Sequence, residues 1–301
     1  MLTIFTPSYN RAYILSNLYR SLLTQTSYDF EWIIVDDASS DNTRELASSF
    51  KTDKFPIRYF LQEHGGKHRA INLAVRKARG NIFFIVDSDD YLLPDAVENI
   101  ISWTKNLPDK SFCGVSGLKC TKNGKIIGGN VTFQNKSTYV DASNLERNKY
   151  GLYGDKAEVY FTDILRKYPF PEFEGEYFVT EGCVWDAIAA DGYKIRWFNK
   201  PIYVCEYLND GLTNTGANEL EGSIKNFKGY LYFISQYLRL HDKIECYGRF
   251  IQYNKVCKRR DIPYLKRGKY IGFSVKKYIK YTLESTIYRI VKKIKNTYKK
   301  N

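Results

Sequence analysis

The chain has 301 residues, 44% of them hydrophobic and 26% charged, which provides material for one large core or two small ones and excludes a mostly disordered protein. No apolar run approaches the roughly 18–20 residues of a membrane-spanning helix, and the first residues do not have the pattern of a secretory signal. The net charge is +13, and the six cysteines form no CxxC pairs, so we expect free thiols in place of disulfides or a zinc site.

Short apolar runs alternate with helical patterns over residues 1–110. The predicted strands are Leu2–Phe5, Glu31–Val35, Ile57–Leu61 and Asn81–Val86. The predicted helices are Arg11–Thr26, Asp41–Phe50, Lys67–Arg79 and Pro94–Asn106. Apolar strands that alternate with helices are typical of a parallel sheet covered on both faces. We therefore predict an α/β fold with a mostly parallel, mixed sheet flanked by helices.

The rest of the chain is less regular up to residue 215 and then becomes helical. Within 111–215 we predict the strands Cys113–Lys119 and Lys125–Gly128. Residues 219–254 and Val275–Tyr298 have helical patterns. The change of pattern predicts a boundary near residue 215 and a helical C-terminal extension.

The positive charge is concentrated at the end of the chain. From Lys255 onward there are 16 Lys and Arg and two acids, a net of +14, so the first 254 residues have a net charge of −1. Apolar residues recur at helical spacing in Val275–Tyr298, with lysines opposite. A basic amphipathic helix favours the surface of an anionic membrane. Two other interpretations stay open, namely a helix whose apolar stripe packs on the body and a nucleic-acid patch.

Polar and acidic residues follow three of the predicted strands. These segments are Thr6–Arg11 (TPSYNR), Asp36–Thr43 (DDASSDNT) and Asp87–Asp90 (DSDD). The carboxyl ends of parallel strands meet at one edge, where ligands bind in such folds. Carboxylates there are costly unless they are paired or coordinate a cation, and their oxygens suit Mg²⁺ or Mn²⁺. The alternative is that Asp89 or Asp90 caps the helix that opens near Pro94.

Single residues of these segments have roles that their chemistry favours. Asp36 can accept a hydrogen bond from a nucleobase, and Tyr9 can stack on a base. Arg11 can bind phosphate or stay a solvated helix residue, while Asp41 is expected to cap the next helix.

A glycine pair precedes a basic helix in the segment Glu63–Arg69 (EHGGKHR). A glycine-rich turn at a helix N-terminus favours anions, and Lys67 can contact phosphate or base. His64 and His68 are spaced like a metal pair, but the sequence shows no partners for a zinc site.

Taken together, TPSYNR, VDDASSDNT, the Gly-Gly-Lys segment with Asn72, and VDSDD closely resemble glycosyltransferase family 2. The similarity is high over residues 1–107 and moderate over 150–215. It implies a GT-A domain over 1–215, with a nucleotide-sugar-binding half at 1–110 and an acceptor half at 111–215. Residues 216–301 would be the helical, basic C-terminal region.

The resemblance also implies site residues. The nucleotide-sugar donor would be bound by Thr6, Pro7, Tyr9, Asn10, Arg11, Asp36, Lys67, Asn72, Asp87 and Ser88. Asp89 would bind a divalent metal, Mn²⁺ or Mg²⁺, that bridges the diphosphate. Family members are typically inverting, so that one carboxylate deprotonates the acceptor hydroxyl as it attacks the anomeric carbon.

The sequence departs from the family pattern in the acceptor half. Relatives often have a Glu-Asp pair opening a helix, whereas here Gly182 follows Glu181. We favour Glu181 as the base over Asp186; the alternative is that the helix dipole alone explains an acid there.

Two further positions bear on the metal and the acceptor. Asn209 stands roughly where many relatives have a histidine, and Asp210 is a possible substitute ligand. Asp155 either lines the acceptor pocket or fixes a turn.

These features predict an inverting glycosyltransferase that moves a sugar from a nucleotide-diphosphate donor, with a UDP-sugar favoured, to a glycan hydroxyl. The basic tail and the resemblance favour a polyprenyl-linked acceptor in capsule or cell-wall assembly. The enzyme would be cytoplasmic and peripheral on the inner face of the cell membrane, without nucleic acid as a partner; a homo-oligomer is left open.

Two alternatives belong to other classes. A nucleotidyltransferase usually needs a glycine-rich phosphate loop after the first strand, which TPSYNRAY lacks. A non-catalytic membrane or nucleic-acid binder leaves the three acidic strand ends unexplained.

Overall fold

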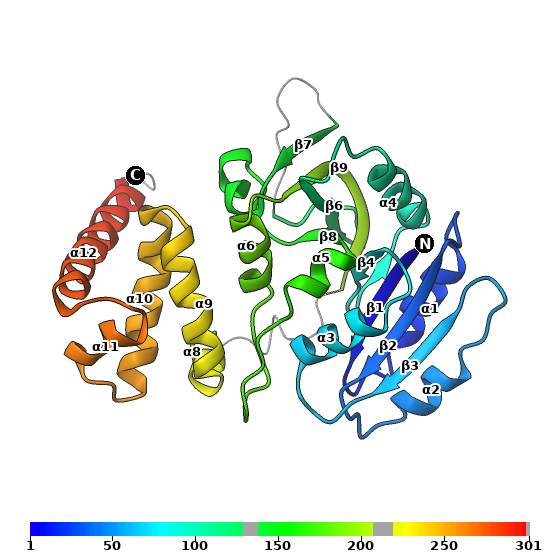
Figure 1. Ribbon diagram of the computed structural model, residues 1–301, viewed down its shortest axis with the longest axis horizontal. Helices are drawn as coiled ribbons and strands as arrows, with labels where there is room; N and C mark the ends of the chain where they lie inside the picture. The colour runs from blue at the N-terminus through cyan, green and yellow to red at the C-terminus, as the bar shows by residue number, and fades with distance from the viewer. Residues whose placement is uncertain (129–137, 207–218, 299–301) are drawn as a thin grey trace. The chain divides into compact units, whose positions relative to one another are not determined.

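The computed structural model describes residues 1–128, 138–206 and 219–298 (Figure 1). The chain divides into two compact units, Met1–Phe170 with Val184–Thr215, and Pro171–Cys183 with Gly216–Asn301. All six cysteines are free thiols, as predicted. Within the described ranges, no helix combines the length and apolarity needed to cross a bilayer. The domain boundary placed after residue 215 stays a prediction.

Four parallel strands form the N-terminal part of the sheet. They are β1 (Leu2–Ser8), β2 (Phe30–Asp36), β3 (Ile57–Leu61) and β4 (Ile82–Ile85), in the order β3-β2-β1-β4. All four match predicted strands, because runs of β-branched and aromatic residues favour strands. β1 and β2 are almost wholly buried, whereas β3, at the edge of the sheet, is partly exposed.

The sheet continues with mixed directions, as predicted. The order runs on through β8 (Lys156–Phe161), β6 (Phe112–Thr121), β9 (Lys194–Cys205) and β5 (Tyr91–Leu92), and β7 (Tyr139–Ala142) pairs with β9. β8 is antiparallel to both β4 and β6, while β6 and β9 are parallel.

One predicted strand of this region is wrong. Lys125–Gly128 forms only an isolated bridge between Cys120 and Ile126. Gly124 and Gly128 both have positive φ, so the chain turns where an extended strand was expected.

Helices cover both faces of the sheet. α1 (Leu15–Leu23), α2 (Thr43–Ser49) and α4 (Ala96–Lys105) share one core with the face that includes Trp32. The opposite face carries α3 (Lys67–Lys77), α5 (Thr162–Lys167) and α6 (Gly182–Ala190) (Figure 1). There, Tyr160 of β8 stacks on Trp185 of α6, with ring centroids 4.2 Å apart. A short 3₁₀ helix, η2, covers Asn144–Tyr150.

The second unit is helical, as predicted for residues 219–254 and 275–298. It contains α8 (Glu219–Lys225), α9 (Phe227–Leu240), α10 (Lys243–Arg259), α11 (Tyr264–Tyr270) and α12 (Val275–Tyr298). Its core is mostly aromatic and includes Phe250, Tyr253, Tyr278 and Tyr281.

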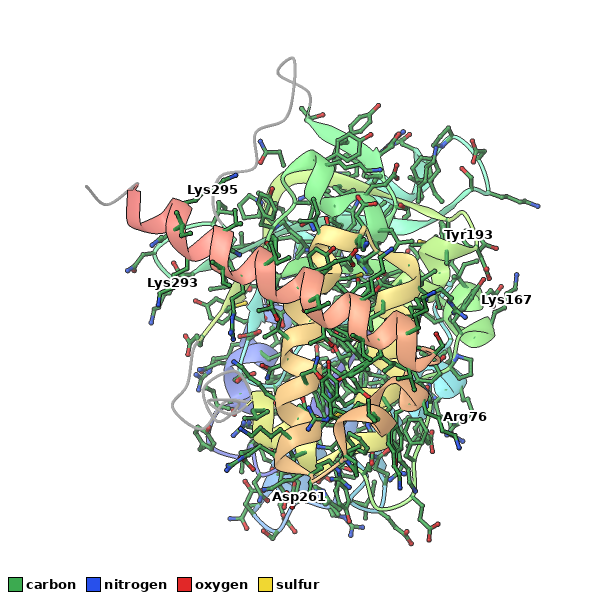
Figure 2. The ribbon with its side chains drawn as sticks, turned by 90° about the vertical axis from the view of Figure 1, so that its left-hand side faces the viewer. Arg76, Lys167, Tyr193, Asp261, Lys293 and Lys295 are labelled. Atoms are coloured by element: carbon green, nitrogen blue, oxygen red, sulfur yellow. The ribbon has the colours of Figure 1, made fainter. Side chains whose placement is uncertain are left out.

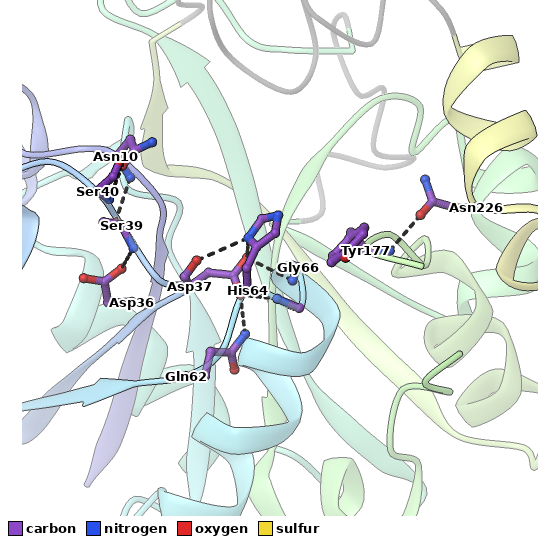
Figure 3. Close-up of polar contacts among 11 residues, drawn as sticks. Asn10, Asp36, Asp37, Ser39, Ser40, Gln62, His64, Gly66, Tyr177 and Asn226 are labelled. Carbon is purple, nitrogen blue, oxygen red and sulfur yellow. Dashed lines mark hydrogen bonds and ion pairs between the residues drawn. The ribbon is translucent and has the colours of Figure 1, made fainter. Parts of the chain in front are cut away.

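The segment 171–183 belongs to this helical unit. Glu176 accepts hydrogen bonds from the backbone N–H groups of Lys228 and Gly229, at 2.7 and 2.8 Å. The side-chain oxygen of Asn226 accepts the N–H of Tyr177 at 2.8 Å (Figure 3). The start of α9 therefore holds the chain that leads to Glu181.

Candidate donor site at the strand ends

The loops that follow β1 and β2 are locked together. The side-chain oxygen of Asn10 accepts the N–H of Ser40, and the N–H of Asn10 donates to Ser39 Oγ, both at 2.8 Å (Figure 3). Asn10 has a φ of 54°, a left-handed conformation that asparagine adopts more readily than most residues. Two motifs that lie about thirty residues apart in the sequence thus form one structure.

Asp36 is buried at the start of the second loop, with 1% of its surface exposed. Its carboxylate accepts hydrogen bonds from the Ser39 N–H at 2.8 Å and from the Tyr59 hydroxyl at 2.7 Å. Burial and the adjacent Asp36 raise the pKa of Tyr59 well above its ordinary value, so the phenol keeps its proton. The contact of Asp36 with a nucleobase stays a prediction.

Asp41 lies just before α2 and also bonds to the first loop. Its carboxylate accepts hydrogen bonds from the N–H groups of Thr43 and Ala12, each at 3.0 Å. This agrees with a role at the start of the helix and adds a second tie between the loops.

Asp37, which the sequence analysis did not single out, fixes the glycine turn. Its carboxylate accepts the N–H groups of Gly65 and Gly66, at 2.7 and 2.9 Å, and the amide of Gln62 at 2.7 Å (Figure 3). These glycine N–H groups therefore bind a protein carboxylate, where an external anion was expected. In the sequence, this contact was indicated only by an acid beside Asp36 and by a glycine pair far away in the chain.

Tyr9 and His64 form an aromatic pair at the edge of this site. Tyr9 is 46% exposed, and its ring centroid lies 4.8 Å from that of His64. His64 Nδ1 lies 3.0 Å from Asp37. His68 is buried on α3. The structure thus places the His64 ring against Asp37 and Tyr9, and it leaves part of the tyrosine ring exposed for stacking.

The charges of two lysines, Lys67 and Lys119, act on Asp87. Lys67 Nζ is 2.6 Å from the Asp87 carboxylate, and the backbone N–H of Asp87 donates to the Tyr203 hydroxyl at 3.0 Å. Burial raises the pKa of Asp87, but the charges of Lys67 and Lys119 outweigh it and hold the pKa below the ordinary value. Lys119 Nζ lies 4.4 Å from the centre of the Tyr203 ring. A single lysine in a strand has no sequence signature, so Lys119 was missed.

The negative charge of Asp87 also acts on Asp89 and Asp90. Burial, followed by the charge of Asp87, raises the pKa of both, that of Asp90 to about 7. Asp90 accepts the N–H of Glu206 at 2.9 Å. Neither residue caps α4, which begins at Ala96, so the capping alternative is wrong.

This grouping of carboxylates suits a bound divalent cation. A bound cation reduces the repulsion between neighbouring carboxylates, and carboxylate oxygens are the ligands that Mg²⁺ and Mn²⁺ prefer. Among the residues that the structure describes, no group of three or more His, Cys, Asp or Glu could hold a metal. The described part of the chain would therefore supply one or two carboxylates, and phosphate and water are the further ligands that Mg²⁺ usually keeps. Asn209 and Asp210 lie outside the described residues.

Three of the predicted site residues are buried and hydrogen-bonded within the protein. Thr6 is fully buried and accepts the indole N–H of Trp32 at 2.9 Å. Asn72 is buried and bonds both backbone groups of Phe170, each at 2.9 Å. Asp186 is buried and accepts the amide of Asn144 at 2.7 Å. These hydrogen bonds connect segments that lie far apart in the sequence, and the substrate or catalytic roles of the three residues stay predictions.

The remaining predicted residues differ in exposure. Pro7 is partly exposed at the end of β1, while Ser88 is buried. The charge of Arg11 acts on Asp89 and lowers its pKa against the larger raising effects. Asp155 is exposed, and together with Asp87 it raises the pKa of Lys119 against the opposing effect of burial.

Glu181 belongs to the second unit and is partly exposed, in the turn just before α6. Its role as the base stays a prediction.

The comparisons with known proteins agree with the motifs. The family model "Glycosyl transferase family 2" matches residues 3–168, more than half of the chain. A chondroitin synthase of Pasteurella multocida is 39% identical over 98 residues, which cover 33% of this chain and 10% of that protein. Glycosyltransferase GlyG of Streptococcus pneumoniae is 33% identical over 101 residues, 33% of this chain and 34% of that protein. The chain thus spans a tenth of the first relative and about a third of the second.

Solved structures share the fold at low sequence identity. S. aureus TarS in complex with UDP-GlcNAc has a TM-score of 0.59 at 18% identity, covering 92% of this chain and 89% of that one. The mannosyltransferase PcManGT from Pyrobaculum calidifontis, in complex with GDP-Man and Mn²⁺, has a TM-score of 0.55 at 18% identity, covering 100% and 88%. The chain belongs to glycosyltransferase family 2 and has the GT-A fold.

Proposed function

We propose that this glycosyltransferase moves a sugar from a nucleotide-diphosphate donor, with a UDP-sugar favoured, to a hydroxyl of a glycan and inverts the anomeric centre. The arrangement of Lys67, Asp87 and Asp89 carries the proposal. The ammonium group of Lys67 lies 2.6 Å from the Asp87 carboxylate, and the charge of Asp87 raises the pKa of Asp89. The site therefore offers a positive charge for a diphosphate and carboxylates for its metal.

The donor would be bound by residues from three loops. The exposed face of Tyr9 would stack on the nucleobase, and Asp36 would accept a base N–H. Lys67 and Arg11 would contact the diphosphate, since charge-assisted hydrogen bonds to phosphate are strong. The bonds of Asn10 with Ser39 and Ser40 would keep these loops in place before the donor arrives.

Asp89 would hold Mn²⁺ or Mg²⁺, with Asp87 beside it. Such a cation, when bound, neutralises charge on the departing diphosphate. Asp87 would keep Lys67 oriented toward the same phosphates, because its carboxylate is 2.6 Å from the ammonium group.

Glu181 would serve as the general base. As the acceptor oxygen attacks the anomeric carbon, its proton would pass to the Glu181 carboxylate while the bond from that carbon to the diphosphate oxygen breaks. Asp155, exposed before β8, would line the acceptor side.

The proposed acceptor is a glycan carried on a polyprenyl lipid at the inner face of the cell membrane. Relatives named as chondroitin and hyaluronan synthases support a polysaccharide product. The net charge of +14 after residue 254 supports work at an anionic surface. Surface polysaccharide assembly, in a capsule or cell wall, would be the setting.

Thermal unfolding with UDP, GDP, dTDP and CMP, each with and without Mn²⁺, tests the donor site. A ligand at about 100 times its Kd adds about 2.7 kcal/mol of stability. We expect one nucleotide to raise Tm only with Mn²⁺, and Asp89→Ala to lose this shift. The exposed Asp53→Ala is the matched control and should keep it. No shift with any nucleotide, or an unchanged shift in Asp89→Ala, would contradict the proposal.

Glu181→Gln separates the base from the donor site. The variant should lose turnover and keep donor affinity, because an amide cannot take the acceptor proton. The nearby exposed Glu174→Gln should keep both. A large loss of donor affinity in Glu181→Gln would place this residue among the donor contacts.

A further inference from the structure

The helix α12 has two faces of different character. Tyr278, Tyr281 and Ser285 are buried on its inner face, and the two tyrosines belong to the core of the helical unit. On the other side, aliphatic residues are 38–61% exposed, and we call them the outer face: Ile279, Leu283, Ile287, Ile290, Val291 and Ile294. Their spacing of one, three or four residues places them on one side of the helix.

The outer face is not an ordinary protein surface. Single exposed aliphatic residues are common, and Ile244 and Leu265 are two such residues in the same unit. A contiguous stripe of exposed aliphatic residues is rare and marks a site of interaction. The inner face already anchors α12 to the folded unit, so the stripe is presented on a fixed helix.

Basic residues lie both within the outer face and beside it. On a helical projection, Lys276 and Lys280 fall within the aliphatic arc and Lys293 at its edge. Figure 2 shows Lys293 and Lys295 near the C-terminal end of α12. Glu284 is the one acid in this helix, and it pairs with Lys243 at 2.9 Å.

We infer that the outer face of α12 lies on an anionic lipid bilayer, with the helix parallel to the surface. The aliphatic side chains would enter the interface while the lysines bind lipid phosphates. A second copy of α12 would bring its own lysines against these, and nucleic acid offers no apolar surface for isoleucines. The inference deepens the proposed lipid-linked acceptor, and it does not depend on the transfer chemistry.

Vesicle co-sedimentation tests the inference, with vesicles of phosphatidylcholine alone and of phosphatidylcholine with phosphatidylglycerol. The full chain should bind the anionic vesicles and release them as salt rises, since screening weakens exposed charge interactions. The triple variant Leu283→Gln, Ile287→Gln, Ile290→Gln should lose about ten-fold in affinity for each side chain replaced.

The control is the double variant Ile244→Gln, Leu265→Gln, which removes exposed aliphatic residues outside the stripe. It should bind anionic vesicles as the wild type does. Both variants should keep the wild-type Tm and its shift with nucleotide and Mn²⁺. That readout separates loss of membrane binding from failure of the donor site or of folding.

Three results would overturn the inference. The triple variant could bind anionic vesicles as tightly as the wild type, which would make the attraction purely electrostatic. The wild type could fail to bind anionic vesicles or bind neutral ones equally well. Finally, the triple mutation could abolish a self-association or an RNA binding of the wild type, seen by sedimentation, which would assign the outer face to that partner.

Discussion

The carboxylate of Glu176 accepts the backbone N–H of Gly229 at 2.8 Å, in the first turn of α9. It also accepts the N–H of Lys228, so a residue some fifty positions earlier caps this helix. A carboxylate is well suited there because the N-terminus of a helix carries a partial positive charge. The same segment leads to Glu181, so the C-terminal helices hold in place the loop of the proposed base.

Glu176→Ala should lower the free energy of unfolding by about 1–2 kcal/mol, the usual effect of losing a cap. It should also reduce turnover while the donor affinity stays unchanged, because the donor residues lie in the other unit. Urea unfolding and donor titration measure the two effects. The exposed Glu174→Ala is the control, and equal stability of the two variants would refute the role of the cap.

Lys119→Met should weaken donor binding about ten-fold, or about 1.4 kcal/mol. The substitution removes a positive charge that acts on Asp87 and leaves the acidic cluster with less compensation for an incoming diphosphate. Titration with the UDP-sugar in Mn²⁺ measures the change. Lys122→Met, in an exposed turn, should bind normally. If Lys119→Met kept full affinity, this lysine would serve the fold alone.

Asp37→Asn should destabilise the protein by about 1–3 kcal/mol, because an amide nitrogen would face backbone N–H groups that lose their acceptor. The donor affinity should fall as well, since Lys67 directly follows the glycine turn that Asp37 holds. Thermal unfolding with and without nucleotide reports both changes. Asp53→Asn, at an exposed position, provides the baseline.

Lowering the pH should destabilise the protein, because it protonates Glu31 in the sheet. This buried carboxylate accepts hydrogen bonds from Thr3 and Arg58, each at 2.8 Å, and from the Arg79 N–H at 2.6 Å. Burial raises its pKa, but these bonds outweigh burial and hold the pKa below the ordinary value. Its contribution to stability is therefore complete above the unfolded value of about 4.3 and is lost as the pH falls through the folded pKa.

Urea unfolding of the wild type and of Glu31→Gln as a function of pH tests this loss of stability in acid. The wild type should be the more stable protein at pH 7, and the difference should shrink as the pH falls below about 4.3. A difference that stays constant down to pH 3 would show that ionisation of Glu31 does not matter.

The sequence by itself determined most elements of the first half, and it predicted the edge of the sheet at which the proposed donor site lies. Strands such as Ile57–Leu61 and helices such as α3 have a period that local sequence shows directly. The acidic motifs follow strands, so their convergence at one edge follows from the topology of parallel sheets. The C-terminal helix Val275–Tyr298 was predicted with its bounds, because its aromatic and aliphatic residues repeat at helical spacing.

Only the tertiary structure decided which polar side chains face outward and which brace the fold. Thr6 and Asn72 belong to motifs, yet each is buried with a partner far away in the chain, Trp32 and Phe170. Asp37, Lys119 and Glu176 were missed for the same reason. Hydrogen bonds between segments distant in the sequence leave no periodic pattern, because they depend on how the elements pack and on which polar groups packing removes from water.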